Sequence, residues 1–278
     1  MGENPVPSQA TFRTCYRRRQ TWWHRAAYMR SAKVMLLRRL LAAEGIDLAH
    51  RRVLDYGFGA GAFLQDCPTS GSLFGVEMDP EAVAELGAFL RARGFAQVDL
   101  RPLDVERWRE NALLALRYDV IVCSHVLEHL PNPVELLAAL RQCLAPGGAL
   151  LVLLPIHERR RDSHHAHAVT PALAFEWCAR AGLAVARRFD SDYACDPFQP
   201  VFAWRGRLGR IVAQGVSLGL GLAAKLVGEN RWMPLGDRLG PKLGWRPTQL
   251  ALALAPSAEN ADAPPSLPSR AEEGKRLS

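Results

Sequence analysis

Short apolar runs of β-strand type alternate with helical segments between residues 52 and 154, and this alternation limits the possible folds more than any other feature. The expected strands are Arg52–Tyr56, Ser72–Val76, Gln97–Arg101, Tyr118–Cys123 and Ala149–Leu154. The expected helices follow Gly61, run from Pro80 to Arg93 and run from Pro133 to Leu144. Strands joined through helices lie parallel, because each helix crosses back over the sheet. The sequence therefore predicts an α/β fold with a doubly wound, mostly parallel sheet.

Residues that favour helix ends mark two of these helices. Asp79 is expected to cap the second helix, and Gly94 lies just beyond its end. Asn132 is expected to begin the third helix, with Glu135 placed for a capping box. The segment Pro146–Gly148 is expected to form a turn before the fifth strand.

Segments outside this core differ in composition and periodicity. The expected units are residues 1–20 (flexible N-terminus), 21–48 (helical cap), 49–190 (core), 191–248 (inserted lid or substrate segment), 249–255 (last core strand) and 256–278 (disordered tail). Apolar residues at helical spacing indicate the cap, whose helix spans Trp22–Ala43. The insertion is too long for a loop and holds a helical run at 208–227. The last expected strand is Gln249–Ala255.

A glycine-rich turn, Asp55–Gly61, follows the first strand. Its glycines permit positive φ angles and let a ligand approach the backbone. The turn alone leaves two cofactor classes open, since Gly57, Gly59 and Ala62 also match a dinucleotide-binding pattern, with Glu77 about 20 residues further on. A nicotinamide- or flavin-dependent enzyme therefore has to be considered.

Carboxylates around this turn favour a cationic cofactor. Asp55 stands two residues before the first glycine, where it can accept hydrogen bonds from an ammonium group but would repel a pyrophosphate. Asp104 follows the third strand and is placed to accept from an adenine amino group. Ser124–Leu130 follows the fourth strand. These loops leave the carboxyl ends of strands, where open α/β sheets bind their ligands.

As a set, these segments resemble the motifs of class I (Rossmann-like) S-adenosyl-L-methionine (SAM)-dependent methyltransferases. The segments are Val53–Gly61, Phe74–Asp79, Leu103–Val105, Tyr118–Val122, Leu127–Leu130 and Leu144–Leu150. The resemblance covers roughly residues 50–190. It implies SAM as cofactor, a SAM-binding core at 49–190, and methyl transfer to oxygen, nitrogen or carbon of a small-molecule acceptor. It also implies that the C-terminal strand, Gln249–Ala255, is antiparallel. The apolar insertion suggests an acceptor with a hydrophobic part.

The resemblance also implies roles for individual residues. They are Asp55, Gly57, Gly59 and Gly61 for the methionine moiety, Glu77 for the ribose, Met78, Asp104 and Val105 for the adenine, and Ser124 near the sulfonium methyl. A base is needed where the acceptor is a hydroxyl or an ammonium, and a histidine suits that role at neutral pH. His157, directly after the fifth strand, and His125, after the fourth, are the candidate catalytic residues.

The remaining histidines of interest form a cluster, His164, His165 and His167. Imidazoles are frequent metal ligands, but beyond Asp162 no carboxylate or cysteine stands at ligand spacing. We therefore expect no metal site.

The first 44 residues carry nine Lys and Arg against two Glu, within a chain of net charge +7. This basic helix is expected to be solvated or to contact an anionic membrane. No Asn-Pro-Pro-Tyr-like segment follows the fourth strand, so nucleic acid is an unlikely partner. Six scattered cysteines, no apolar signal core and a broken apolar stretch at Ile211–Ala224 predict a cytoplasmic protein. The alternative functions are a membrane-peripheral SAM-binding protein without catalysis and an NAD(P)-binding oxidoreductase.

Overall fold

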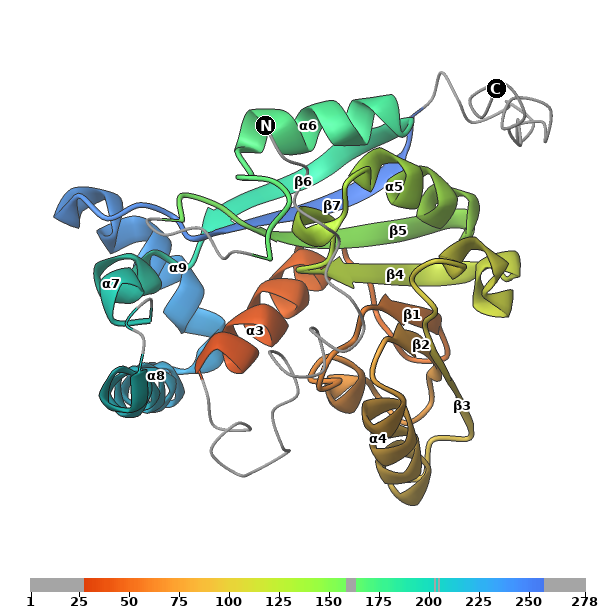
Figure 1. Ribbon diagram of the computed structural model, residues 1–278, viewed down its shortest axis with the longest axis horizontal. Coiled ribbons are helices and arrows are strands. Elements are labelled where there is room, and N and C mark those ends of the chain that lie inside the picture. The colour runs from red at the N-terminus through yellow and green to blue at the C-terminus, as the bar shows by residue number, and fades with distance from the viewer. Residues whose placement is uncertain (1–27, 159–163, 203, 205, 258–278) are drawn as a thin grey trace.

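The computed structural model describes residues 28–158, 164–202, 204 and 206–257, and these residues build a seven-stranded sheet (Figure 1). Its strands are β1 (Arg52–Tyr56), β2 (Ser72–Glu77), β3 (Gln97–Pro102), β4 (Tyr118–Ser124), β5 (Leu144–Pro155), β6 (Leu183–Ser191) and β7 (Gln249–Pro256). The strand order is β3-β2-β1-β4-β5-β7-β6. β7 is antiparallel to both of its neighbours, and β1 to β5 pair in parallel. The predicted fold class is confirmed.

Helices cover both faces of this sheet (Figure 1). On one face lie α5 (Pro133–Gln142) and α6 (Pro171–Arg180), and on the other α3 (Tyr28–Ala43) and α4 (Pro80–Ala92). The inner strands are apolar at nearly every position, because successive side chains point to opposite faces and both faces are covered.

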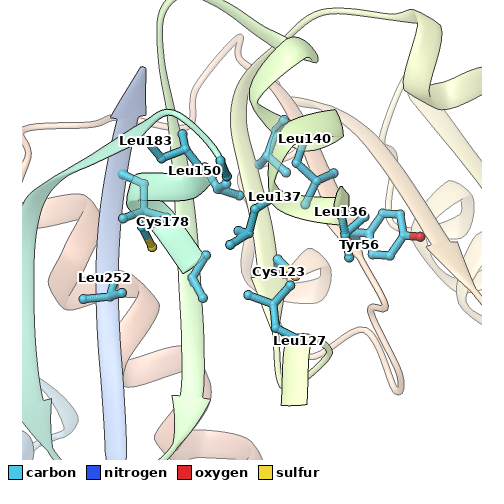
Figure 2. Packing of buried hydrophobic residues seen from close by; sticks show 14 of the residues in the cluster. Tyr56, Cys123, Leu127, Leu136, Leu137, Leu140, Leu150, Cys178, Leu183 and Leu252 are labelled. Atoms are coloured by element: carbon cyan, nitrogen blue, oxygen red, sulfur yellow. The ribbon is translucent and has the colours of Figure 1, made fainter. Parts of the chain in front are cut away.

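The core beneath α5 and α6 is a close-packed aliphatic layer (Figure 2). Leu136, Leu137 and Leu140 form the inner face of α5 and pack with Leu150 and Leu252 of the sheet. Cys123 and Cys178, in the same layer, are buried thiols without a disulfide, as is Cys143.

The described part of the insertion between β6 and β7 contains three α-helices: α7 (Gln199–Phe202), α8 (Gly206–Val227) and α9 (Glu229–Leu239). Among the described residues, α8 is the one helix long and apolar enough to cross a membrane, judged by length and composition. The expected run at 208–227 is thus a continuous helix. This helix is longer than the apolar stretch Ile211–Ala224, which was expected to be too short to span a bilayer.

A buried hydrogen-bond network, the Tyr28–Asp192 network, fastens this insertion to α3. The Tyr28 hydroxyl donates to Asp192 Oδ1 (2.7 Å) and accepts from Trp232 Nε1 of α9 (2.7 Å). The Thr248 hydroxyl, just before β7, donates to Asp192 Oδ2 (3.0 Å). Ser217 of α8 accepts from the backbone amide of Tyr28 (2.9 Å). Burial raises the pKa of Asp192 to about 6, and its donors oppose that rise.

The prediction of a helix directly after Gly61 is wrong. The segment forms loose turns that end in a single 3₁₀ turn, Leu64–Asp66. Cys67, which precedes Pro68, is extended with ψ of 151°. A residue before proline avoids the helical region. That restriction leaves too few residues between the glycine turn and Pro68 for a stable α-helix.

Two helix-end predictions have opposite outcomes. Asp79 caps α4 as expected, accepting from the Glu81 amide (3.1 Å). The capping box at α5 is wrong, because the Asn132 side chain makes no cap hydrogen bond. Asn132 Nδ2 instead donates to Glu135 Oε1 (2.7 Å), and Glu135 also pairs with Arg109.

Strand β5 begins earlier than expected. α5 ends at Gln142 rather than Leu144, and Pro146–Gly148 lies inside β5 as an irregularity instead of preceding the strand. A Cβ on Gly148 would lie 2.9 Å from the Tyr118 carbonyl oxygen. Glycine is required there because the two backbones approach closely. The neighbouring strand β7 reaches Pro256, which was expected to belong to the disordered tail. Residues 1–20 and 258–278 lie outside the described residues.

Candidate cofactor site

The glycine turn bends sharply out of β1 and is held by side chains from two other elements. Gly57 (φ 73°) faces Val126, whose Cγ2 would lie 2.5 Å from an added Cβ. Gly61 (φ 66°) faces Leu86 of α4, whose Cδ2 would lie 2.1 Å from such an atom. Positive φ and close packing together restrict both positions to glycine.

Glu77 is held in place by the same turn. Its Oε2 accepts from the Gly59 amide (2.6 Å), and its Oε1 accepts from the Met78 amide (2.8 Å). Burial raises the pKa of the Glu77 carboxyl, whereas these amide donors favour its ionised form. The structure therefore brings two predicted site features together and orients the carboxylate at the end of β2.

The predicted site residue Asp55 is buried, with 3% of its surface exposed. Burial raises the pKa of this carboxyl to about 7, the charge of Lys33 lowers it, and the charge of Glu77 raises it further. Apolar surroundings disfavour the ionised carboxylate unless a cation lies beside it. Asp55 is thus placed to gain from a cationic ligand.

Lys33 is a candidate site residue that the sequence interpretation missed. It projects from α3, where burial lowers the pKa of its ammonium group and the charges of Glu128, Asp55 and Glu77 raise it. Leu37 and Leu40, four and seven residues later, are buried. A residue at that helical spacing belongs to the covered face of the helix. This spacing was a signal in the sequence, but Lys33 was grouped with the surface arginines.

Ser124 and His125 end β4 beside these charged groups. The Ser124 hydroxyl oxygen is buried and makes no hydrogen bond within the described residues. His125 has a φ of 56°, and its Nδ1 lies 3.3 Å from Glu128 Oε1. Burial, and then the charge of Lys33, lower the pKa of the His125 ring, with Glu128 and Gln249 opposing that shift.

The predicted adenine contacts lie at the neighbouring strand end. β3 pairs with β2 up to Pro102, and the Leu103 amide donates to the Glu77 carbonyl (2.9 Å). Asp104 is exposed and accepts from the Glu106 amide (3.0 Å), while Val105 is half-buried. Met78 is partly buried against the core. The backbone pairing therefore carries Asp104 and Val105 close to the end of β2.

His157 occupies a different position from His125. It is exposed, has a φ of 52°, and its Nδ1 donates to the Pro247 carbonyl (2.9 Å). Its ring therefore contacts the segment that leads into β7, whereas the His125 ring contacts Glu128. The two candidate bases therefore have different hydrogen-bond partners.

Comparison with known proteins identifies relatives of this architecture. A family model described as "Methyltransferase domain" matches residues 22–185, more than half of the chain. The ubiquinone biosynthesis O-methyltransferase of Marinobacter nauticus is 32% identical over 112 residues, which cover 39% of this chain and 46% of that protein. The protein of the same name from Azoarcus sp. is 27% identical over 207 residues, covering 66% and 84%. The chain spans about half the length of the first curated relatives that it matches.

A solved structure shares the fold across most of the chain. The crystal structure of coclaurine N-methyltransferase, bound to N-methylheliamine and SAH, superposes with a TM-score of 0.54 at 14% identity. The match covers 87% of this chain and 74% of that one. At this identity the likeness concerns the fold.

Proposed function

The chain belongs to the class I SAM-dependent methyltransferases, and we propose that it transfers the methyl group of SAM to a hydroxyl oxygen of a small amphipathic molecule. The family match over residues 22–185 carries this proposal. The curated relatives named above are O-methyltransferases, which favours oxygen over nitrogen or carbon as the accepting atom.

The charged groups around the glycine turn suit the charge pattern of SAM. We assign the methionine ammonium to Asp55, the methionine carboxylate to Lys33 and the ribose hydroxyls to Glu77. A buried carboxylate of raised pKa gains its counter-charge when the cation binds. Gly57, Gly59 and Gly61 would leave the backbone open to the ligand.

The nicotinamide alternative fits this site less well. A dinucleotide places its pyrophosphate on a helix N-terminus after the glycine turn, and here only a 3₁₀ turn, Leu64–Asp66, follows within residues 62–67. The carboxylates of Asp55 and Glu77 would also repel the phosphates.

The acceptor side is assigned to the insertion at 191–248 and to the strand ends that carry Ser124, His125 and His157. In-line transfer requires the acceptor oxygen to face the sulfonium methyl and to lose its proton. His125, at the end of β4 beside Ser124, is the better placed of the two candidate bases. A kcat lowered far more by His125→Gln than by His157→Gln, at equal SAM affinity, would support this assignment.

We further propose that α8 lies on a membrane surface on the cytoplasmic side. A stripe of its side chains at helical spacing is exposed to solvent: Leu208 (61%), Ile211 (56%), Leu222 (59%) and Leu226 (80%). The helix contains no acidic residue and carries three basic ones. Such a face suits the interface of an anionic bilayer, and it would place the enzyme beside a lipid-soluble acceptor.

The basic N-terminal helix is less suited to that contact than expected. In its described part, Arg38 pairs with Asp66 and with Glu229 (2.9 Å), and Arg39 pairs with Asp237. The arginines before residue 28 lie outside the described residues. These ion pairs favour α8 as the membrane-facing element.

Titration calorimetry with SAM, SAH and NADH tests the cofactor assignment, and SAH release with catechols tests the reaction. We expect SAM and SAH to bind, NADH not to bind, and a catechol with a prenyl tail to be methylated at a higher kcat/KM than catechol itself. Binding of NADH without SAM would overturn the proposal. Binding of SAM without turnover of any hydroxyl acceptor would favour a binding protein without catalysis.

Co-sedimentation with vesicles of anionic phospholipid tests the surface of α8. The double substitution Leu222→Ser and Leu226→Ser is expected to abolish sedimentation. The matched control is Phe89→Ser, which removes a side chain 37% exposed on α4. Equal loss in the control, or no loss in the double variant, would refute the role of α8.

A further inference from the structure

The clearest unexplained feature outside the cofactor site is the buried side chain of Glu128. This residue is fully buried, with 0% of its surface exposed. Neither carboxylate oxygen accepts a hydrogen bond from a described residue, although His125 Nδ1 lies 3.3 Å from Oε1. A buried carboxylate whose oxygens accept no well-formed hydrogen bond is costly, even with the charge of Lys33 and the His125 ring nearby. Its presence points to a cation that completes the site.

Two histidines lie beside this carboxylate. One ligand atom each from Glu128, His129 and His165 lies within 4.8 Å of the other two. Donors on a tetrahedral ion with bonds of about 2.0–2.2 Å lie about 3.3–3.6 Å apart. Small side-chain rotations would therefore bring the three atoms onto one ion.

We propose that Glu128, His129 and His165 bind a divalent first-row transition-metal ion. Two imidazoles and one carboxylate are the donors that such an ion prefers, whereas Mg²⁺ and Ca²⁺ prefer oxygen donors throughout. Three protein ligands leave a coordination position for water or for an oxygen of a bound molecule.

The second ring nitrogens of both histidines are already engaged in the way that metal ligands require. His129 Nδ1 donates to the His164 carbonyl (3.0 Å), and His165 Nδ1 lies 2.9 Å from Glu158 Oε2. Because each Nδ1 is engaged in this way, Nε2 is the nitrogen through which each ring would coordinate the ion. A carboxylate behind a histidine also raises the basicity of its coordinating nitrogen. Glu128 and Glu158 together balance the two charges of the ion.

The two segments that supply the ligands are held together without the ion. The His167 amide donates to the Glu128 carbonyl (3.2 Å), and His167 Nε2 donates to the Leu130 carbonyl (2.9 Å). The His129 and His165 rings meet edge to face, with centroids 4.8 Å apart. The donors are therefore preorganised, which lowers the entropic cost of binding the ion.

The test uses the full chain without a polyhistidine tag, stripped with EDTA and titrated with Zn²⁺ by calorimetry and with Co²⁺ by visible absorption. We expect one equivalent of each ion to bind, with a visible band typical of four- or five-coordinate Co²⁺. His165→Gln is expected to weaken Zn²⁺ binding by more than about 100-fold, and Glu158→Gln by about 10- to 100-fold. Zn²⁺ should raise the Tm of the wild type and leave that of His165→Gln unchanged.

The matched control is His164→Gln, which removes an imidazole from the same segment but keeps the backbone carbonyl that holds His129. It is expected to bind Zn²⁺ like the wild type. Far-UV circular dichroism verifies that each variant folds. If His165→Gln does not fold, Glu158→Gln, which keeps all three ligands, replaces it as the test variant. No stoichiometric binding by the wild type, or equal losses in His164→Gln and His165→Gln, would overturn the proposal. SAM affinity, measured in parallel, belongs to the proposed function and does not decide this one.

Discussion

Replacing Asp55 by Asn is expected to stabilise the protein without SAM at neutral pH and to remove tight SAM binding. Burial holds the pKa of Asp55 at about 7, against 3.8 for an ordinary aspartate. Between these values the native state binds more protons than the unfolded state, so stability falls as the pH rises. At about 1.4 kcal/mol per tenfold change in proton affinity, the loss reaches about 4 kcal/mol above pH 7. The uncharged amide of Asn, which has the same shape, avoids this loss of stability.

Urea unfolding of the wild type and of Asp55→Asn, from pH 4 to pH 8, measures the effect. We expect nearly equal free energies of unfolding at pH 4 and a gap that widens to about 4 kcal/mol in favour of the variant at pH 8. Saturating SAM should close the gap, because the wild type alone gains the ammonium contact. The control is Asp47→Asn, at an exposed aspartate. A variant less stable than the wild type at pH 8 would refute the reasoning.

Three further substitutions probe the turn, the core and the insertion. Gly61→Ala, which combines positive φ with a clash against Leu86, should cost about 1–3 kcal/mol and weaken SAM binding in calorimetry; an unchanged Tm would contradict this. Leu140→Ala, in a fully buried position, should cost about 2–5 kcal/mol in urea unfolding, and a cost below about 1 kcal/mol would show that the layer is loosely packed. Tyr28→Phe removes a donor to buried Asp192 and the acceptor of Trp232 Nε1, and should cost about 1–3 kcal/mol in thermal unfolding. The cost should be smaller below pH 4, where the Asp192 carboxyl is protonated, and an equal cost at all pH values would contradict the assigned hydrogen bond.

The strands were predictable because burial of both sheet faces leaves continuous apolar runs in the sequence. The run at Tyr118–Cys123 is one example, and the structure extends it by a single residue. Cap residues were less reliable. Asp79 caps α4 by accepting from the Glu81 amide, whereas Asn132 and Glu135 bond to each other, and Arg109 competes for Glu135. Competition of that kind depends on tertiary neighbours and leaves no local pattern.

Those residues of the candidate cofactor site that directly follow a strand in the sequence were predictable. Glu77 and the Gly59 amide meet because parallel neighbours bring their carboxyl ends to one edge. Lys33 does not follow a strand but lies on helix α3, and its position depends on how α3 packs against the sheet. The histidine cluster was interpreted without its carboxylate, because Glu128 lies 37 residues before His165 in the sequence and meets it only in the fold.

The Tyr28–Asp192 network has a kinetic consequence. Because α3 carries both Tyr28 and Lys33, the insertion and the lysine that we assign to the cofactor are parts of one mechanically coupled unit. The insertion cannot swing outward as an independent flap unless buried hydrogen bonds break. We therefore expect spent cofactor to exchange through movement of the short loops at the strand ends. Turnover would then be more sensitive to stiffening of those loops than to changes within α8.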